Sequence, residues 1–136
     1  MKHIHFDPEP DGFYRAYWPC QGADCAVIAM LGDDPEDHMA RSAVKWLLGQ
    51  GVSVLTMSPA KKDYSHHNYP LERVEAAIAW LTAHGNRKVG IAGASTTGTL
   101  ALTAASYFPA LTLTIAMTAS DFVWQGFAQG DRDGCK

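Results

Sequence analysis

The sequence has few of the features that accompany binding to nucleic acids or insertion into membranes. It carries no block of lysine and arginine, and its 11 basic and 14 acidic residues leave a formal net charge of −3. Proteins that bind nucleic acids or anionic membranes usually carry a basic patch. The longest unbroken apolar run, Cys25 to Leu31, is far shorter than the roughly 20 residues that span a bilayer. We therefore expect neither nucleic acid nor a membrane as a partner.

The first seven residues lack the apolar stretch of a signal peptide, because lysine, histidine and aspartate are interspersed among them. This predicts a soluble, cytoplasmic protein. The three cysteines also lack metal or redox spacing, since Cys20 and Cys25 are five positions apart and fit neither a zinc knuckle nor a CxxC pair. We interpret them as free thiols. Two histidine pairs have no cysteine or carboxylate at ligand spacing, so we expect no metal: His3 with His5, and His66 with His67.

The length and composition fit one folded domain covering residues 1–136, since 47% of the residues are hydrophobic and 18% are charged. Apolar and β-prone segments alternate with segments of helical spacing. The predicted strands are 3–6, 13–18, 25–31, 52–57, 88–92 and 111–117, and the predicted helices include Met39 to Leu47, Pro70 to about His84, and Thr97 to Tyr107. This order predicts an α/β fold with a mainly parallel, doubly wound sheet and an antiparallel N-terminal edge.

Charged residues are absent from Val89 to Ser120. A membrane span is the competing interpretation of such a stretch, but Pro109, three glycines and many hydroxyl side chains interrupt it. The stretch therefore predicts a buried strand, helix and strand at the centre of the sheet.

The turn from Gly90 to Gly98 lies where the carboxyl end of a parallel strand would meet a helix, which is the usual place for a ligand. Gly93 and Gly98 have the spacing of a phosphate-binding loop, but no lysine follows. A dinucleotide fingerprint would need glycine where Ser95 stands. Neither pattern is complete, and we expect no cofactor.

A nucleophile elbow is the third interpretation, in which a sharp strand-to-helix turn exposes the hydroxyl of Ser95. Gly93 and Ala94 are small, as the upstream side of such a turn requires. Downstream the sequence departs from G-x-S-x-G, because Thr97 occupies the second glycine position and Gly98 comes one residue later. The alternative is that Ser95 and Thr96 only cap the following helix.

Four stretches resemble the C-terminal catalytic domain of acyl-CoA thioesterases and bile acid-CoA:amino acid N-acyltransferases: 68–72, 91–100, 104–109 and 119–127. The resemblance implies an α/β-hydrolase fold and a serine-dependent acyl hydrolase or acyltransferase acting on esters or acyl-CoA thioesters. It implies that Ser95 is the nucleophile. The oxyanion would be held by the backbone N–H groups of Thr96 and Asp33.

Histidine is absent after Ser95, although the triad of this fold runs from serine to an acid and then to histidine. We therefore expect an incomplete α/β-hydrolase fold, the N-terminal part of a domain truncated or nicked after Lys136. The acid and the base would come from a C-terminal half or from a second copy, and the chain alone would be inactive. The alternative is a non-catalytic half-domain that assembles with a partner polypeptide.

Overall fold

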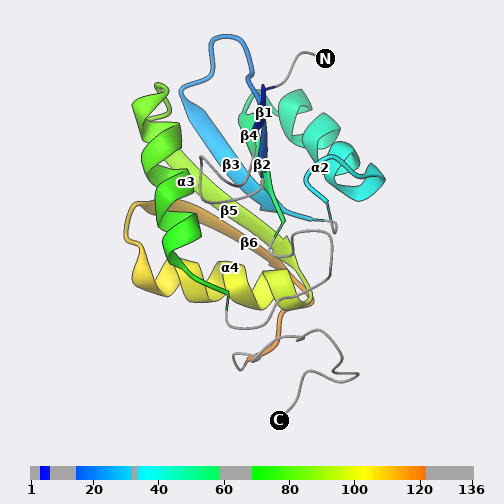
Figure 1. The fold of residues 1–136 in the computed structure, drawn as a ribbon, viewed down its shortest axis with the longest axis vertical. Helices are drawn as coiled ribbons and strands as arrows, with labels where there is room; N and C mark the ends of the chain where they lie inside the picture. Colours follow the sequence, from blue (N-terminus) through cyan, green and yellow to red (C-terminus); the bar gives the residue numbers. More distant parts are fainter. Residues whose placement is uncertain (1–3, 7–14, 32–33, 59–68, 122–136) are drawn as a thin grey trace.

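The computed structural model describes residues 4–6, 15–31, 34–58 and 69–121, and within them the strands form one sheet with the order β1-β2-β4-β3-β5-β6 (Figure 1). The strands are β1 (Ile4–Phe6), β2 (Arg15–Trp18), β3 (Cys25–Met30), β4 (Ser53–Met57), β5 (Lys88–Ala94) and β6 (Leu111–Met117). The helices are α2 (His38–Gly49), α3 (Glu72–Ala83) and α4 (Thr96–Tyr107).

The sheet is parallel from β4 through β3 and β5 to β6, and β1 and β2 pair antiparallel at the other edge. This confirms the predicted α/β class with a mainly parallel sheet and an antiparallel N-terminal edge. The described elements begin and end close to the predicted positions. The main difference from the prediction at the carboxyl end of the sheet is that β5 continues past Ala92. Gly93 and Ala94 still pair with Ala116 and Met117 of β6.

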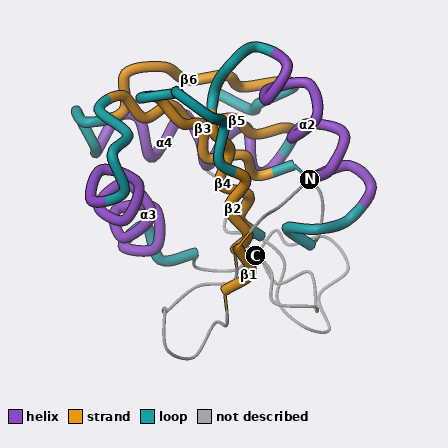
Figure 2. Tube along the Cα trace, turned by 90° about the horizontal axis from the view of Figure 1, so that it is seen from above, coloured by secondary structure: helices purple, strands orange, loops and turns teal. Residues whose placement is uncertain are grey.

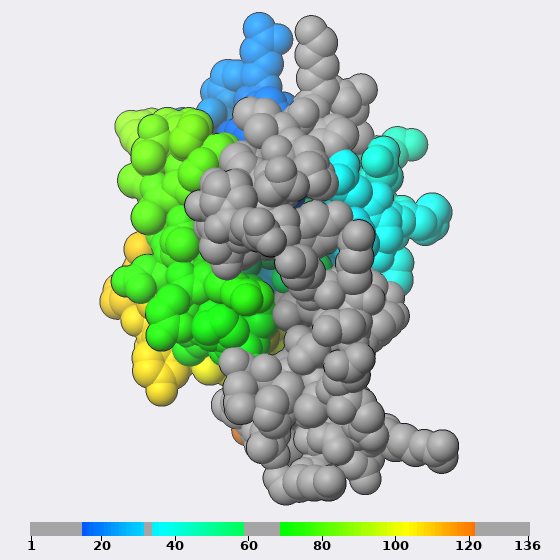
Figure 3. All heavy atoms as spheres, viewed as in Figure 1, coloured from blue at the N-terminus to red at the C-terminus, as the bar shows by residue number. Residues whose placement is uncertain are grey.

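Helices cover both faces of the sheet, α2 on one face and α3 with α4 on the other (Figure 2). The alternation of side chains along β3 explains this arrangement. Ile28 packs in the cluster that contains α3 and α4, whereas its neighbour Val27 packs in the cluster that contains Val44 and Leu47 of α2. The space-filling view likewise has α3 and α2 on opposite sides of the molecule (Figure 3). The doubly wound arrangement is therefore confirmed.

The central strands β3 and β4 are buried on both faces, as their apolar sequences require. Ile28, Ala29 and Leu55 have no exposed surface. β3 lies between β4 and β5, so its carboxyl end is held by a parallel neighbour on each side. This makes the end of β3 a fixed point beside the end of β5.

The prediction that the uncharged stretch lies at the centre of the sheet is correct for β5 and wrong for β6. β6 pairs with β5 on one side and has no strand on its other side among the described residues. Leu113 and Met117 are 52% and 44% exposed. The apolar composition of a strand indicates that it suits a buried position. Whether its side chains are exposed depends on which strands and helices pack against it. The described part of the chain leaves this edge uncovered.

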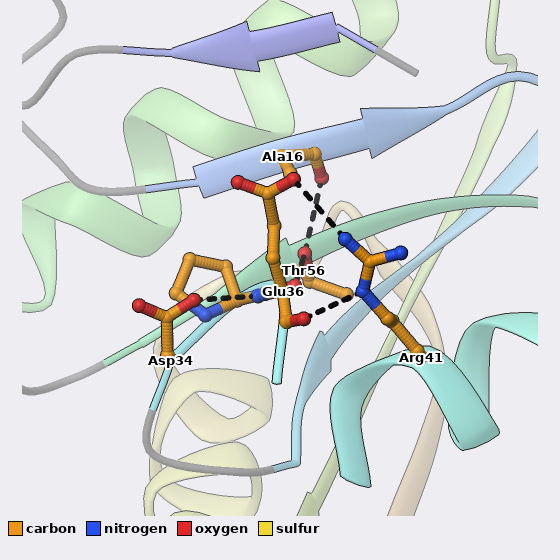
Figure 4. A network of polar contacts seen from close by, with 6 residues as sticks. Ala16, Asp34, Glu36, Arg41 and Thr56 are labelled. Carbon is orange, nitrogen blue, oxygen red and sulfur yellow. Dashed lines mark hydrogen bonds and ion pairs between the residues drawn. The ribbon is translucent and has the colours of Figure 1, made fainter. Parts of the chain in front are cut away.

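The segment between β3 and α2 is tied to the sheet by side-chain hydrogen bonds (Figure 4). The buried Thr56 hydroxyl of β4 lies 2.6 Å from the Pro35 carbonyl and 3.3 Å from the Ala16 carbonyl. The Asp34 carboxylate accepts a hydrogen bond from Glu36 N, and Asp37 accepts one from Ala40 N, each at 2.8 Å. These bonds fix residues 34–37 against the sheet as the chain enters α2.

The three described helices contain 12 residues each, and none of them is long and apolar enough to cross a membrane. The cytoplasmic location and the single domain stay predictions.

Replacement of Asp37 tests the start of α2. Asp37 is the N-cap, and its carboxylate satisfies a backbone N–H that the helix itself leaves unbonded. We expect Asp37→Ala to lower the free energy of unfolding by about 0.5–2 kcal/mol in denaturant titrations. Ser42→Ala is the control, because the Ser42 hydroxyl is exposed and bonds only to the His38 carbonyl within the helix. Equal losses from both variants would contradict a capping role.

Candidate functional site

Ser95 occupies the turn between β5 and α4, at the carboxyl end of β5. Its backbone angles are φ 55° and ψ −122°, a conformation that residues with a side chain rarely adopt. Such strain costs on the order of 1–3 kcal/mol and is found most often at functional sites. In Figure 1 the tip of β5 and the start of α4 meet at this turn. The predicted strained strand-to-helix turn is therefore confirmed.

The strained backbone of Ser95 is held by hydrogen bonds on both sides. Ser95 N donates to the Met117 carbonyl of β6 at 2.9 Å, and the Ser95 carbonyl accepts from Thr99 N at 3.1 Å. The Ser95 side chain is exposed and makes no capping hydrogen bond to α4. Ser95 thus occupies the N-cap position of α4, but its hydroxyl does not cap the helix. Its hydroxyl faces solvent at the edge where parallel strands present ligands.

The glycines on either side of Ser95 are required by the close approach of α4. A Cβ atom on Gly93 would overlap the carbonyl of Thr97, and a Cβ on Gly98 would lie 2.9 Å from the Met117 carbonyl. Gly93 therefore lets α4 pass β5, and Gly98 lets it pass β6. The departure from G-x-S-x-G thus has a structural explanation, since the second close contact falls at position 98.

Thr97 is not among the predicted site residues, yet its side chain is buried beneath the turn. It is 6% exposed, and its hydroxyl oxygen accepts a hydrogen bond from Ala94 N at 2.9 Å. The same oxygen lies 2.6 Å from the Met30 carbonyl at the end of β3. The sequence does carry a signal for this role: Thr97 is a hydroxyl residue within an apolar stretch, at the position where the motif usually has glycine. A hydroxyl buried in such a stretch needs a hydrogen-bond partner, so its position indicates a structural contact.

The two proposed oxyanion donors differ in how far the structure describes them. Thr96 is the first residue of α4, so its N–H belongs to the turn at the positive end of the helix dipole. Asp33 lies outside the described residues. Its described neighbours Leu31 and Asp34 belong to the segment that leaves the carboxyl end of β3, and Met30 is paired with Gly93 of β5. The segment that contains Asp33 therefore starts at the same edge of the sheet as Ser95.

Shifted pKa values are found at one ion pair and one tyrosine in the described part of the chain. The ion pair between Asp24 and Arg87 precedes β3 and β5, at the opposite edge of the sheet. The hydrogen bond from Arg87 and its positive charge lower the pKa of the Asp24 carboxyl. Burial raises the pKa of the Tyr69 hydroxyl, which precedes α3. The ion pair is therefore a structural contact away from the Ser95 turn, whereas the shift at Tyr69 comes from its burial.

No group of three or more histidine, cysteine or acidic residues within the described ranges is arranged to hold a metal ion. Cys20 and Cys25 are free thiols, whereas Cys135, His3 and the pair His66–His67 lie outside the described residues. His5 lies in β1; of the histidines with described side chains, His84 stacks on Trp80 at the end of α3 and His38 begins α2. Neither is hydrogen-bonded to Ser95 in the described part of the chain.

A comparison with solved structures gives the class of fold. The chain resembles the esterase Pf2001 of Pyrococcus furiosus with a TM-score of 0.65 and 18% sequence identity, over 84% of this chain and 53% of that one. It resembles Est1E of Butyrivibrio proteoclasticus with a TM-score of 0.63 and 16% identity, over 88% of this chain and 51% of that one.

A third similar structure is the Agrobacterium tumefaciens protein ATU1826, of unknown function and suggested to be an α/β hydrolase, with a TM-score of 0.68 and 14% identity. That match covers 89% of this chain and 63% of the other. The chain thus has the fold of the α/β hydrolases and spans between 51% and 63% of the length of these three structures. No family model and no curated protein matches the sequence.

Alanine at Gly93 tests the close approach of α4 to β5. Because the added Cβ would overlap the Thr97 carbonyl, we expect Gly93→Ala to cost at least about 4 kcal/mol, a large part of the roughly 5–15 kcal/mol by which ordinary domains are stable. Gly49→Ala is the matched control, since nothing lies within 4 Å of its Cβ position at the end of α2. Thermal unfolding should be unchanged or slightly raised in the control. A Gly93→Ala variant as stable as the control would contradict the packing described.

Proposed function

We propose that this protein is a serine-dependent acyl hydrolase acting on esters, with Ser95 as its nucleophile. The observation that carries the proposal is the strained turn that presents the exposed Ser95 hydroxyl beyond the end of β5. A serine held in such a strained turn is typical of a nucleophile elbow, in which the hydroxyl is accessible to a substrate. The likeness in fold to esterases supports the same assignment.

In the proposed reaction the Ser95 oxygen attacks the carbonyl carbon of the ester while a base takes its proton. The tetrahedral oxyanion is stabilised by the N–H groups of Thr96 and Asp33. The intermediate then expels the alcohol, which receives a proton from the same base, and leaves an acyl group on Ser95. Water then attacks the acyl-enzyme while the base takes a proton from the water. The base passes this proton to the Ser95 oxygen, and the carboxylic acid product is released.

The finer choice of substrate follows from the resemblance to acyl-CoA thioesterases and N-acyltransferases. A thioester would react by the same steps with a thiol as the leaving group, and an amine could replace water as the acceptor of the acyl group. We propose acyl-CoA thioesters as the second substrate class after simple esters. Since an ester and a thioester with one acyl chain differ only in the leaving group, paired substrates would separate the two classes.

The proposed base and acid come from outside residues 1–136. None of the six histidines follows Ser95, whereas the triad of this fold places histidine after the nucleophile. The similar solved structures are longer than this chain. Among the described residues no strand pairs with the outer edge of β6, and Leu113 and Met117 are exposed there, where a further element would pack. We propose that a C-terminal half of the domain, or a second copy of the chain, covers β6 and supplies both groups.

The exposed apolar surface of β6 also favours a second candidate function, a non-catalytic half-domain that assembles with a partner polypeptide. The two candidates differ in their use of Ser95. An assembly module needs only the β6 edge, whereas the hydrolase needs the Ser95 hydroxyl.

Labelling of Ser95 distinguishes these candidates. In the full-length natural protein we expect a fluorophosphonate probe to label Ser95, and Ser95→Ala to lower p-nitrophenyl ester hydrolysis by at least about 10³-fold. Ser106→Ala is the control, because Ser106 is an exposed serine near the other end of α4. Labelling that persists in Ser95→Ala would place the nucleophile elsewhere, whereas a natural protein that is not labelled would favour the assembly module.

Sedimentation of the isolated chain 1–136 tests the proposed partner. An uncovered edge strand tends to pair with another chain, and burial of apolar surface is worth about 25 cal/mol per Å². We therefore expect the isolated chain to self-associate and to lack esterase activity. A soluble monomer that melts cooperatively and hydrolyses a p-nitrophenyl ester through Ser95 would contradict this proposal.

A further inference from the structure

The Thr97 hydroxyl forms a bridge between the ends of β3 and β5. Ala94 N donates to Thr97 Oγ1 at 2.9 Å, so this oxygen serves as an acceptor on the β5 side. The hydroxyl has a single proton to donate. The Met30 carbonyl at 2.6 Å is closer than the Ala94 carbonyl at 2.8 Å, which favours donation to β3. One buried side chain thus links two neighbouring strands.

The bridge lies at the last paired position of the β3–β5 ladder, where Met30 faces Gly93. Beyond this pair the ladder gives no further backbone contact between the two strands. The Thr97 hydroxyl therefore supplies the last connection before the chain leaves β3. The adjoining segment carries the proposed second oxyanion donor.

The other side of the turn is held differently. Ser95 N donates directly to the Met117 carbonyl, and Thr99 Oγ1 accepts from Ser120 N at 2.9 Å. The connection to β6 thus includes a backbone bond that no side-chain substitution removes, whereas the described connection from α4 to the end of β3 is the Thr97 hydroxyl. A change at Thr97 therefore removes the link to β3 and the acceptor of Ala94 N, while the backbone bond from Ser95 to β6 stays in place.

We propose that Thr97 is a positioning residue that sets the distance between the Ser95 turn and the end of β3 at Met30. The inference rests on the proposed acyl hydrolase function. Oxyanion donors act only when they lie about 2.7–3.1 Å from the developing charge. A displacement of the end of β3 would weaken transition-state stabilisation and leave the binding of the ground-state ester little changed.

At the far end of the same segment the Thr56 hydroxyl lies 2.6 Å from the Pro35 carbonyl. Thr56 and Thr97 therefore hold the two described flanks of the segment, from β4 and from α4 respectively. Loss of the Thr97 hydroxyl would remove the bonds next to Ser95 and leave the Thr56 bond in place. This predicts a local effect on the reaction, beyond a general loss of stability.

The test compares Thr97→Val, which keeps the shape and removes the hydroxyl, with Thr97→Ser, which keeps the hydroxyl and removes a methyl group. Both are made in the full-length natural protein and assayed with p-nitrophenyl butyrate and with a fluorophosphonate probe. We expect Thr97→Val to lower kcat and the labelling rate of Ser95 by about 10- to 100-fold. KM should change by less than about twofold, and Thr97→Ser should stay within about threefold of the natural protein in both rates.

Thr103→Val is the matched control. Like the Thr97 hydroxyl, the Thr103 hydroxyl bonds to a backbone carbonyl, but its partner is Thr99 within α4 and it lies a turn or more away from Ser95. Rates are expressed per active site titrated with excess fluorophosphonate, so that unfolded molecules do not contribute. If Thr97→Val is too unstable to titrate, amide hydrogen exchange at the end of β3 is measured in Thr97→Ser and in the natural protein. Peptides ending at Met30 should then keep the protection of the natural protein, and faster exchange would overturn the proposal.

Three outcomes separate the possible failures. If the natural protein is labelled at Ser95 and Thr97→Val reacts at the same rate, the positioning role is wrong and the proposed hydrolase stands. If Thr97→Ser loses as much kcat as Thr97→Val, packing of the methyl group matters more than the hydroxyl, and the proposal is also overturned. A natural protein without labelling at Ser95 would remove the proposed function and this inference with it.

Discussion

The close passage of α4 across the ends of β5 and β6 is the constraint on which the rest of the site depends. The helix can begin directly after β5 only if residues 93 and 98 carry no side chain, since a Cβ atom at either position would press against backbone. With α4 in that place, the chain must reverse within one residue. Ser95 takes that reversal and its unfavourable backbone angles. Exposure of its hydroxyl is thus a consequence of helix packing.

The strain at Ser95 is offset by bonds drawn from both neighbouring strands. Met117 of β6 accepts from its backbone, and the carbonyl of Met30 in β3 lies within hydrogen-bond distance of the Thr97 hydroxyl just below it. The turn therefore keeps its conformation because three parallel strands end together at this edge. The antiparallel strands β1 and β2 contribute at a distance, by completing the opposite side of the sheet and covering β4.

The local parts of this arrangement could be predicted from the sequence, and the long-range parts could not. The apolar runs of β3 and β4 specify buried strands, and Gly93 with Ser95 specifies a sharp turn, because these signals lie within a few residues. Thr97 differs, since the contact that gives it a role is with Met30, 67 positions earlier. The exposure of β6 likewise depends on a neighbour that its own composition does not reveal. The position of Asp33 stays a prediction.

The distance along the chain between Thr97 and Met30 also bears on the order of folding. Pairing of β3 with β5 joins segments separated by an entire crossover, with β4 and two helices between them. Closing so long a loop costs entropy before its contacts stabilise the chain, so such pairings form late. The turn at Ser95 draws on β3, β5 and β6 together. It should therefore be among the last regions to take its final shape, after the local helices and the β3–β4 pair are in place.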